Sequence, residues 1–91
     1  MSRHTLEQRD KNLADNRLEI VIGWDPPLGT YFVQVFDPAH DESEPGFEVL
    51  WRGIKVAEFL SPDVVIAFVT PWAVVPPDLR GALTADRDAD I

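Results

Sequence analysis

Residues 17–36 read RLEIVIGWDPPLGTYFVQVF and contain two strand-forming runs joined by Asp25-Pro26-Pro27-Leu28-Gly29. The two prolines have no N–H for a strand ladder and Gly29 tolerates a positive φ, so the joining segment is a turn. In the first run, every second residue is large and apolar, as in a strand with one buried face: Leu18, Ile20, Ile22 and Trp24. The stretch therefore predicts a β-hairpin.

Two further segments extend this hairpin. Its second run, from Thr30 to Phe36, is apolar on both faces, which is typical of a strand at the centre of a sheet. Alternation resumes from Phe47 to Gly53 and predicts a third antiparallel strand. Since consecutive strands joined by short links usually pair, we expect a meander. The segment 54–60 fits either an extension of the third strand or a short fourth strand at the edge.

The first predicted helix begins at Ser61-Pro62-Asp63. A serine hydroxyl caps free N–H groups, proline fits the first helical position, and an acid is favourable near the positive end of the helix dipole. We therefore expect a helix from Pro62 to about Thr70, ended by Pro71. The β-branched and aromatic residues at positions 64–69 would also suit a buried strand, which is the alternative.

A second short helix is predicted from Pro77 to about Asp86, because its apolar residues recur at helical spacing. The predicted fold class is α+β, a three-stranded or four-stranded antiparallel meander followed by two short helices packed on one face. A chain of 91 residues fits a single domain, which we place at residues 17–87. The polar residues 1–16 predict a flexible tail, with a short helix from Leu6 to Leu13 as the alternative, and residues 88–91 predict a frayed end.

The composition excludes several classes of site and partner. The chain has no Cys, which rules out disulfides, thiolate metal sites and a cysteine nucleophile. It has neither a signal-peptide core nor a run of roughly 18 apolar residues, so we expect a cytoplasmic protein that does not enter a membrane. The net charge of -8 opposes direct binding to nucleic acid and favours a basic partner.

Residues that could carry chemistry do not form a set typical of catalysis. His4 lies in the predicted tail and His40 in an acidic loop, and neither has a visible partner that would orient it. The acidic loop offers ligands for a metal ion, but their spacing matches no calcium loop: Asp37, His40, Asp41, Glu42 and Glu44. The glycines form no phosphate-binding run before a helix. We therefore predict no enzyme activity, no cofactor and no metal site.

The aromatic residues give the strongest indication of function. Three Trp, five Phe and one Tyr are more than two short helices can easily cover on one face of three strands. Alternation divides the strand residues into two faces, with Phe32, Phe36 and Leu50 opposite Trp24, Val33 and Trp51. Packing inside one subunit is the commoner outcome for such side chains. The alternative, on which the predicted function depends, is that the first three contact another protein or a second copy in a homodimer. The protein is then a non-enzymatic interaction module or an accessory subunit.

The acidic loop suggests a second function. Five acids could occupy a basic groove on another protein, which would make the chain an acidic inhibitor or a nucleic-acid mimic: Asp37, Asp41, Glu42, Glu44 and Glu48. The charges of Asp41, Glu42 and Glu44 are the ones whose reversal would test this. A small metal-dependent enzyme is the third and least favoured interpretation.

The hairpin and the second predicted helix also carry a resemblance to a family. The relevant residues are Gly23-Trp24-Asp25, Pro27-Leu28, Thr30-Tyr31-Phe32, Gln34-Val35, Asp37, Leu50-Trp51 and Pro77-Asp78-Leu79-Arg80. In this pattern the chain resembles a group of short uncharacterised bacterial proteins, some of them plasmid-associated, over roughly residues 18–87. The resemblance implies a compact unit of three or four strands with one or two helices and no established activity. The apolar run 64–69 departs from it, because the family pattern implies a more charged helix there.

Overall fold

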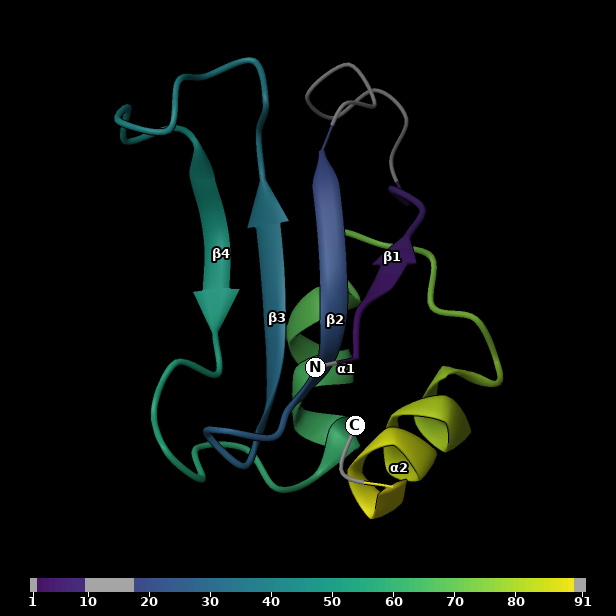
Figure 1. Cartoon of the computed structure of the whole chain (residues 1–91). Coiled ribbons are helices and arrows are strands. Elements are labelled where there is room, and N and C mark those ends of the chain that lie inside the picture. The colour runs from purple at the N-terminus through teal and green to yellow at the C-terminus, as the bar shows by residue number, and fades with distance from the viewer. Residues whose placement is uncertain (1, 10–17, 90–91) are drawn as a thin grey trace.

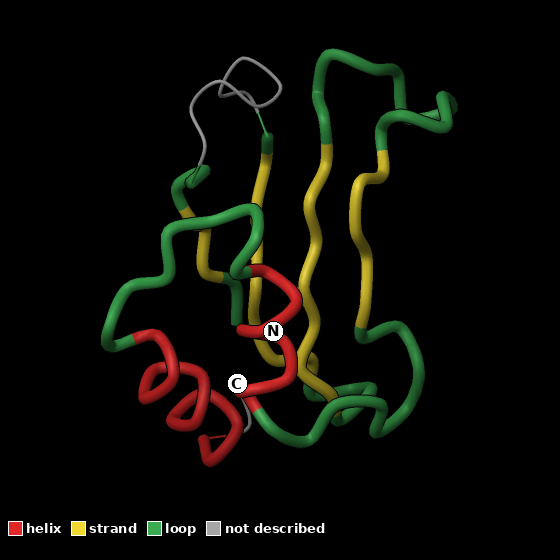
Figure 2. The backbone as a smooth tube through the Cα atoms, turned by 180° about the vertical axis from the view of Figure 1, so that it is seen from behind, coloured by secondary structure: helices red, strands yellow, loops and turns green. Residues whose placement is uncertain are grey.

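The computed structural model describes residues 2–9 and 18–89, which form a four-stranded antiparallel sheet with two helices on one face (Figures 1 and 2). The strands follow one another across the sheet in chain order, β1-β2-β3-β4. This confirms the predicted α+β meander with two helices. The elements are β1 (His4–Leu6), β2 (Glu19–Asp25), β3 (Thr30–Phe36), β4 (Glu48–Arg52), α1 (Pro62–Val69) and α2 (Leu79–Ala89).

The hairpin of β2 and β3 lies at the centre of the sheet. Its register runs without a break from Glu19 opposite Phe36 to Asp25 opposite Thr30. The turn is closed by a hydrogen bond of 2.8 Å from the amide of Gly29 to the carbonyl of Asp25, and Gly29 has a φ of 61°. Glycine adopts this left-handed conformation without the strain that a side chain would cause. The predicted turn is confirmed.

The N-terminal segment differs from the flexible tail predicted for residues 1–16. Residues His4–Leu6 form β1, which pairs with β2 and places Leu6 in the core with 8% of its surface exposed. A segment that cannot bury enough surface alone is ordered here by the backbone hydrogen bonds that a neighbouring strand edge offers. The fourth strand therefore comes from the N-terminus. Residues 7–9 lie alongside residues 72–74, with backbone hydrogen bonds from Arg9 to the carbonyl of Trp72 and from Val74 to the carbonyl of Glu7, so the first half of the alternative helix from Leu6 to Leu13 is wrong. Residues 1 and 10–16 of the predicted tail, with the second half of that helix, lie outside the described residues.

The segment after β4 is an irregular connection, so the prediction of a strand within residues 54–60 is wrong. Gly53 has a φ of 88° and Ala57 a φ of 52°, which turn the chain away from the sheet. The connection is then held by two backbone hydrogen bonds of 2.9 Å, from Ala57 to the carbonyl of Leu28 and from Tyr31 to the carbonyl of Phe59. It returns the chain beneath the sheet to the start of α1.

Both predicted helices are present, so the strand alternative for residues 62–69 is wrong. The Ser61 hydroxyl accepts a hydrogen bond from the amide of Asp63 at 3.3 Å, and proline occupies the first turn. This local capping outweighs the strand preference of the β-branched residues, and the helix then buries Val65 and Val69 from one face. The second helix begins at Leu79 rather than Pro77 and continues to Ala89, so residues 88–89 are helical rather than frayed; residues 90–91 lie outside the described part.

The core lies between the sheet and the helices. Alternate residues of β2 and β3 point into it, including Trp24 and Tyr31, whose rings meet edge to face with centroids 4.9 Å apart. Tyr31 is fully buried, and its hydroxyl donates a hydrogen bond of 3.0 Å to the carbonyl of Leu83 in α2. The β-hairpin and the second helix are therefore joined by a polar contact inside an apolar core. Among the described residues, neither helix has the length and apolar character required to cross a bilayer.

Candidate docking surface

The face of the sheet opposite the helices carries a group of aromatic side chains, which we call the aromatic stripe: Phe32, Phe36, Phe47 and Trp51. Phe36 is at its centre, with its ring stacked on Phe47 at 5.0 Å and edge to face with Trp51 at 5.8 Å. Figure 1 is viewed from this open face, and in the reverse view of Figure 2 the helices lie in front of the strands. No helix among the described residues covers the stripe.

The predicted division of strand residues between the two faces is wrong in β4. Trp51 lies opposite Gln34 and therefore on the open face, whereas Leu50 lies opposite Val35 and packs against the core. Phe32 and Phe36 are on the open face as expected. Alternation along β4 divides its residues into two sets, but it does not say which set faces the helices. That depends on the register with β3, which shifts between Val35 and Phe36.

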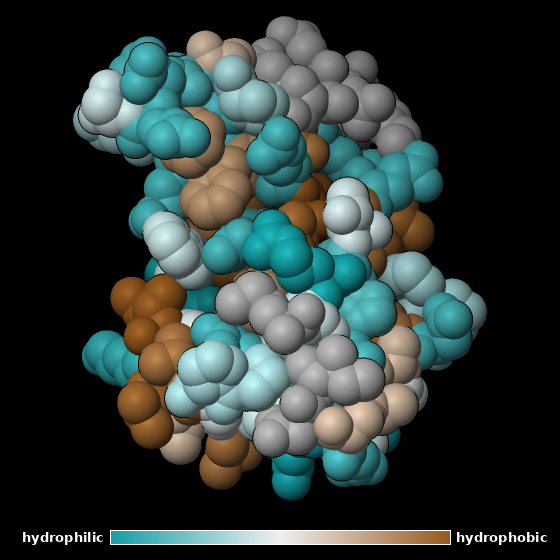
Figure 3. All heavy atoms as spheres, in the orientation of Figure 1, coloured by the Kyte–Doolittle hydropathy of each residue, from teal (hydrophilic) through white to brown (hydrophobic). Residues whose placement is uncertain are grey.

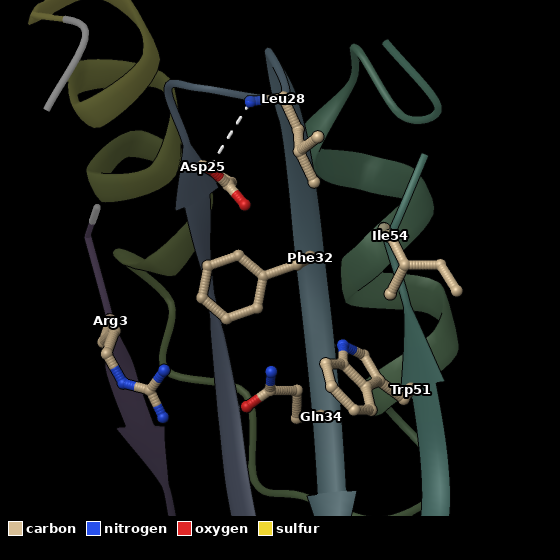
Figure 4. Close-up of a pocket in the computed structure, with 8 residues that line it drawn as sticks. Arg3, Asp25, Leu28, Phe32, Gln34, Trp51 and Ile54 are labelled. Atoms are coloured by element: carbon tan, nitrogen blue, oxygen red, sulfur yellow. Dashed lines mark hydrogen bonds between the residues drawn. The ribbon is translucent and has the colours of Figure 1, made fainter. Parts of the chain in front are cut away.

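A pocket of about 290 Å³ lies at one end of the stripe, and we call it the Phe32 pocket. Figure 4 shows the Phe32 ring in its middle, with Arg3 on one side and Trp51 and Ile54 on the other. Phe32 has only 3% of its surface exposed, whereas Trp51 at the rim has 40% exposed. The complete lining consists of Arg3, Asp25, Leu28, Phe32, Gln34, Trp51, Gly53 and Ile54.

Two glycines allow the Phe32 ring to lie along the sheet. Gly23 in β2 is directly opposite Phe32, and a Cβ atom built on it would lie 2.9 Å from Cε1 of that ring. A Cβ atom on Gly53 would lie 2.6 Å from the Cα atom of Phe32. A side chain on Gly23 would displace the ring, and one on Gly53 would clash with the β3 backbone that carries it. The position of the Phe32 ring therefore depends on both glycines.

The charged groups at the Phe32 pocket come from two segments, Arg3 from just before β1 and Asp25 from the turn end of β2. The Arg3 guanidinium lies 6.0 Å from the centroid of the Phe32 ring, at the limit of a cation–π contact. Asp25 is at the turn, where its Oδ1 atom lies 3.5 Å from the amide of Leu28. Sequence reasoning missed Arg3, because it placed that residue in a tail. The local pattern around Arg3 contains no signal for its position, which results from the pairing of β1 with β2.

The acidic loop lies at the other end of the sheet, between β3 and β4. Its carboxylates are bound within the loop: Asp41 accepts two hydrogen bonds of 3.0 Å from Ser43, and Glu44 accepts one of 2.9 Å from the amide of Asp41. The bonds from Ser43 lower the pKa of Asp41, and the bond from the Asp41 amide, with a smaller contribution from His40, lowers the pKa of Glu44. Both groups are therefore ionised at neutral pH and fixed in place.

A second depression connects this loop to the stripe. Its lining combines a residue of β2, four residues of the acidic loop and one ring of the stripe: Glu19, then Pro38, His40, Asp41 and Glu42, and Phe47. Of the sequence-predicted site residues, Phe32, Phe36, Asp41 and Glu42 therefore lie along one open face, Leu50 lies on the other, and Glu44 supports the loop from within. In the described part of the chain, no group of three or more His, Asp and Glu side chains is arranged to hold a metal ion.

His4 has an orienting partner that the sequence did not indicate. Its Nε2 atom lies 2.6 Å from Oδ2 of Asp86 in α2, and both side chains are partly buried. A carboxylate that orients a histidine is one part of a hydrolytic site, but a nucleophile must also reach the ring. In the described residues His4 makes no hydrogen bond to a hydroxyl group. The contact joins β1 to α2.

A separate apolar area, the α1 patch, consists of Leu60, Val64 and Phe68. Val64 and Phe68 are one helical turn apart on the outer side of α1, and Phe68 has 37% of its surface exposed. Figure 3 shows further apolar surface near the connection from β4 to α1. The α1 patch is on the helical layer, so it offers a comparison for any binding assigned to the open face.

Comparison of the chain with protein-family models, with curated proteins and with solved structures found no match. The resemblance noted in the sequence therefore stays a prediction.

Proposed function

We propose that this protein is a non-enzymatic interaction module that docks a partner protein on the open face of its sheet. The observation that carries the proposal is the aromatic stripe, in which a tryptophan with 40% of its surface exposed stands beside a pocket with an aromatic floor. Exposed aromatic residues beside a concave site are typical of protein interfaces.

The charge of the chain favours a different protein over a second copy as the partner. Each molecule carries a net charge of -8, so two copies repel one another at low ionic strength. The acids Glu19, Asp25, Asp41 and Glu42 line the two depressions on the open face, while among the described residues these linings contain one arginine, Arg3, and one histidine, His40. A basic partner would meet complementary charge along the whole face. This observation also supports the related candidate, an acidic inhibitor that occupies a basic surface.

Affinity capture from cells that produce the protein tests the proposal when it includes paired surface variants. We expect a protein that co-purifies with the wild type and with Phe68→Glu, which changes the α1 patch, but not with Trp51→Glu, which changes the stripe. Light scattering on the purified chain reports whether it self-associates. The same set of captured proteins for all three forms, together with a monomer in light scattering, would contradict the proposal.

A further inference from the structure

We infer that the occupant of the open face is an extended basic segment of the partner, with an arginine side chain seated in the Phe32 pocket. This inference rests on the proposed function and specifies the chemistry of the partner. It starts from the charge and the aromatic surface of the pocket, which suit a planar cation better than an anion or a neutral group.

The pocket already attracts a guanidinium group. Arg3 of the same chain lies against the Phe32 ring at 6.0 Å, at the margin of the pocket rather than within it. Trp51 exposes part of its indole on the opposite side, and tryptophan is the ring that binds cations best. Asp25 adds a carboxylate to the lining, and Arg3 is the one basic residue that the described part of the chain contributes to it. A guanidinium that enters between these groups could stack on a ring and pair with a carboxylate.

The second depression extends this complementarity along the sheet. Glu19 and Asp25 are at opposite ends of β2 and on the same face, since their positions in the strand differ by an even number. At about 3.3 Å per residue, their Cα atoms are roughly 20 Å apart. An extended partner segment with two basic side chains at the same spacing would place one in each depression. The stripe between them would contact the aliphatic parts of the intervening residues.

Single-stranded nucleic acid is the other ligand that an aromatic sheet face can bind, by stacking bases on its rings. Phosphates would then pass the carboxylates of Glu19, Asp25 and Asp41, on a chain with a net charge of -8. This electrostatic cost favours the basic protein segment. An oligonucleotide is therefore included in the test as a competing ligand.

The test is an NMR titration of the isotope-labelled full chain with matched synthetic probes. The main probe is a peptide of Thr and Val with an acetylated N-terminus and an amidated C-terminus, so that its ends carry no charge. It contains two arginines with the same spacing in sequence as Glu19 and Asp25 in β2. The same peptide with citrulline in place of arginine keeps the shape and removes the charge. Two further probes complete the set: the same peptide with glutamate in place of arginine, and a short oligothymidine. Chemical shifts of the Trp51 indole N–H and of the backbone amides of Phe32 and Gln34 locate the binding.

We expect the arginine peptide to shift these three signals, to bind at least about fivefold more tightly than the citrulline peptide, and to weaken as salt is added. Asp25→Asn and Trp51→Ala should each weaken it by roughly three- to tenfold. Their matched controls, Asp78→Asn and Phe68→Ala, should leave the affinity unchanged. Arg3→Ala should strengthen binding by about two- to fivefold, because it removes the internal competitor. A dispersed spectrum confirms that each variant is folded.

Several results would overturn the inference while leaving the proposed function standing. These are equal affinity for the citrulline peptide, tighter binding of the glutamate peptide or of oligothymidine, shifts confined to the α1 patch, and no binding of any probe. In each of these cases, capture that depends on Trp51 but not on Phe68 would still support an interaction module. Loss of that dependence would overturn both.

Discussion

Gly23 and Gly81 both lie in regular secondary structure, yet their surroundings predict opposite effects of a methyl group. A Cβ atom on Gly23 would meet the backbone carbonyl of Ser2 and the Phe32 ring, so Gly23→Ala should destabilise the protein by about 1–3 kcal/mol. Gly81 is exposed in α2 with nothing within 4 Å, so Gly81→Ala should stabilise it by about 0.5–1 kcal/mol. Urea unfolding of the two variants measures both effects, and the same sign for both would contradict this account.

Trp24 and Trp51 form a similar pair at the residue scale. Trp24 has 6% of its surface exposed and packs in the core, so Trp24→Ala should cost about 3–5 kcal/mol, enough to unfold many small domains. Trp51→Ala should change the free energy of unfolding by less than about 1 kcal/mol, because its side chain is already part-exposed. Thermal and urea melts distinguish the two. A large loss for Trp51→Ala would mean that the stripe holds the fold together rather than serving a partner.

Tyr31 gives a pH dependence that a spectrum can isolate. Burial raises its pKa above the ordinary value of 10.0, because the charged phenolate is poorly solvated there. A raised pKa means that the folded state holds the proton more tightly, so the stabilisation is complete below pH 10.0 and is lost as pH rises through the folded pKa. Tyr31 is the one tyrosine in the chain, so phenolate absorbance reports on it alone. We expect the Tyr31 phenol to lose its proton only as the protein unfolds. Deprotonation of Tyr31 near pH 10.0 while the protein stays folded would contradict this.

At the scale of elements, the sequence predicted the strands and helices that are determined by neighbouring residues in the chain. The β2–β3 hairpin follows from two prolines and a glycine between alternating runs, and α1 follows from Ser61 and Pro62. β1 could not be found in the same way, because three residues carry no reliable period and their order depends on an edge that β2 provides from a distance. The face assignment of Trp51 failed for a related reason, since register is a property of two strands together. The Phe32 pocket depends both on the pairing of β1 with β2 and on the register of β4 with β3. Only part of the candidate site was therefore predictable from the sequence.

The cap of α1 can be tested as an element. Ser61→Ala removes the acceptor for the amide of Asp63 and should cost about 0.5–2 kcal/mol. Thr84→Ala is its matched control, because the Thr84 hydroxyl in α2 bonds to the carbonyl of Arg80 within the helix and caps no end. Unfolding in urea should show a loss for Ser61→Ala and a change near zero for Thr84→Ala. Equal effects would mean that tertiary packing alone fixes the start of α1.

At the scale of the whole molecule, the described residues form two layers, and no helix among them covers the second side of the sheet. The shortest dimension is 17 Å, close to one sheet and one layer of helices packed about 10 Å apart. The helices bury one face, and the large rings on the other face cover one another and the glycine backbones beside them. The open face is therefore the side of the sheet on which we propose that a partner docks.

The charge of the molecule should control how fast a basic ligand reaches that face. Glu42 suits a test because it is exposed in the second depression, whereas Asp41 and Glu44 also hold the loop together through hydrogen bonds. Glu42→Lys changes the net charge from -8 to -6 without removing those bonds. We expect slower association of a peptide with a single arginine, a weaker dependence on salt and little change in its dissociation from the Phe32 pocket, which Glu42 does not line. Stopped-flow fluorescence measures all three. Asp88→Lys makes the same change of charge on α2, so an equal effect there would mean that the mean charge of the molecule, rather than the open face, steers the ligand.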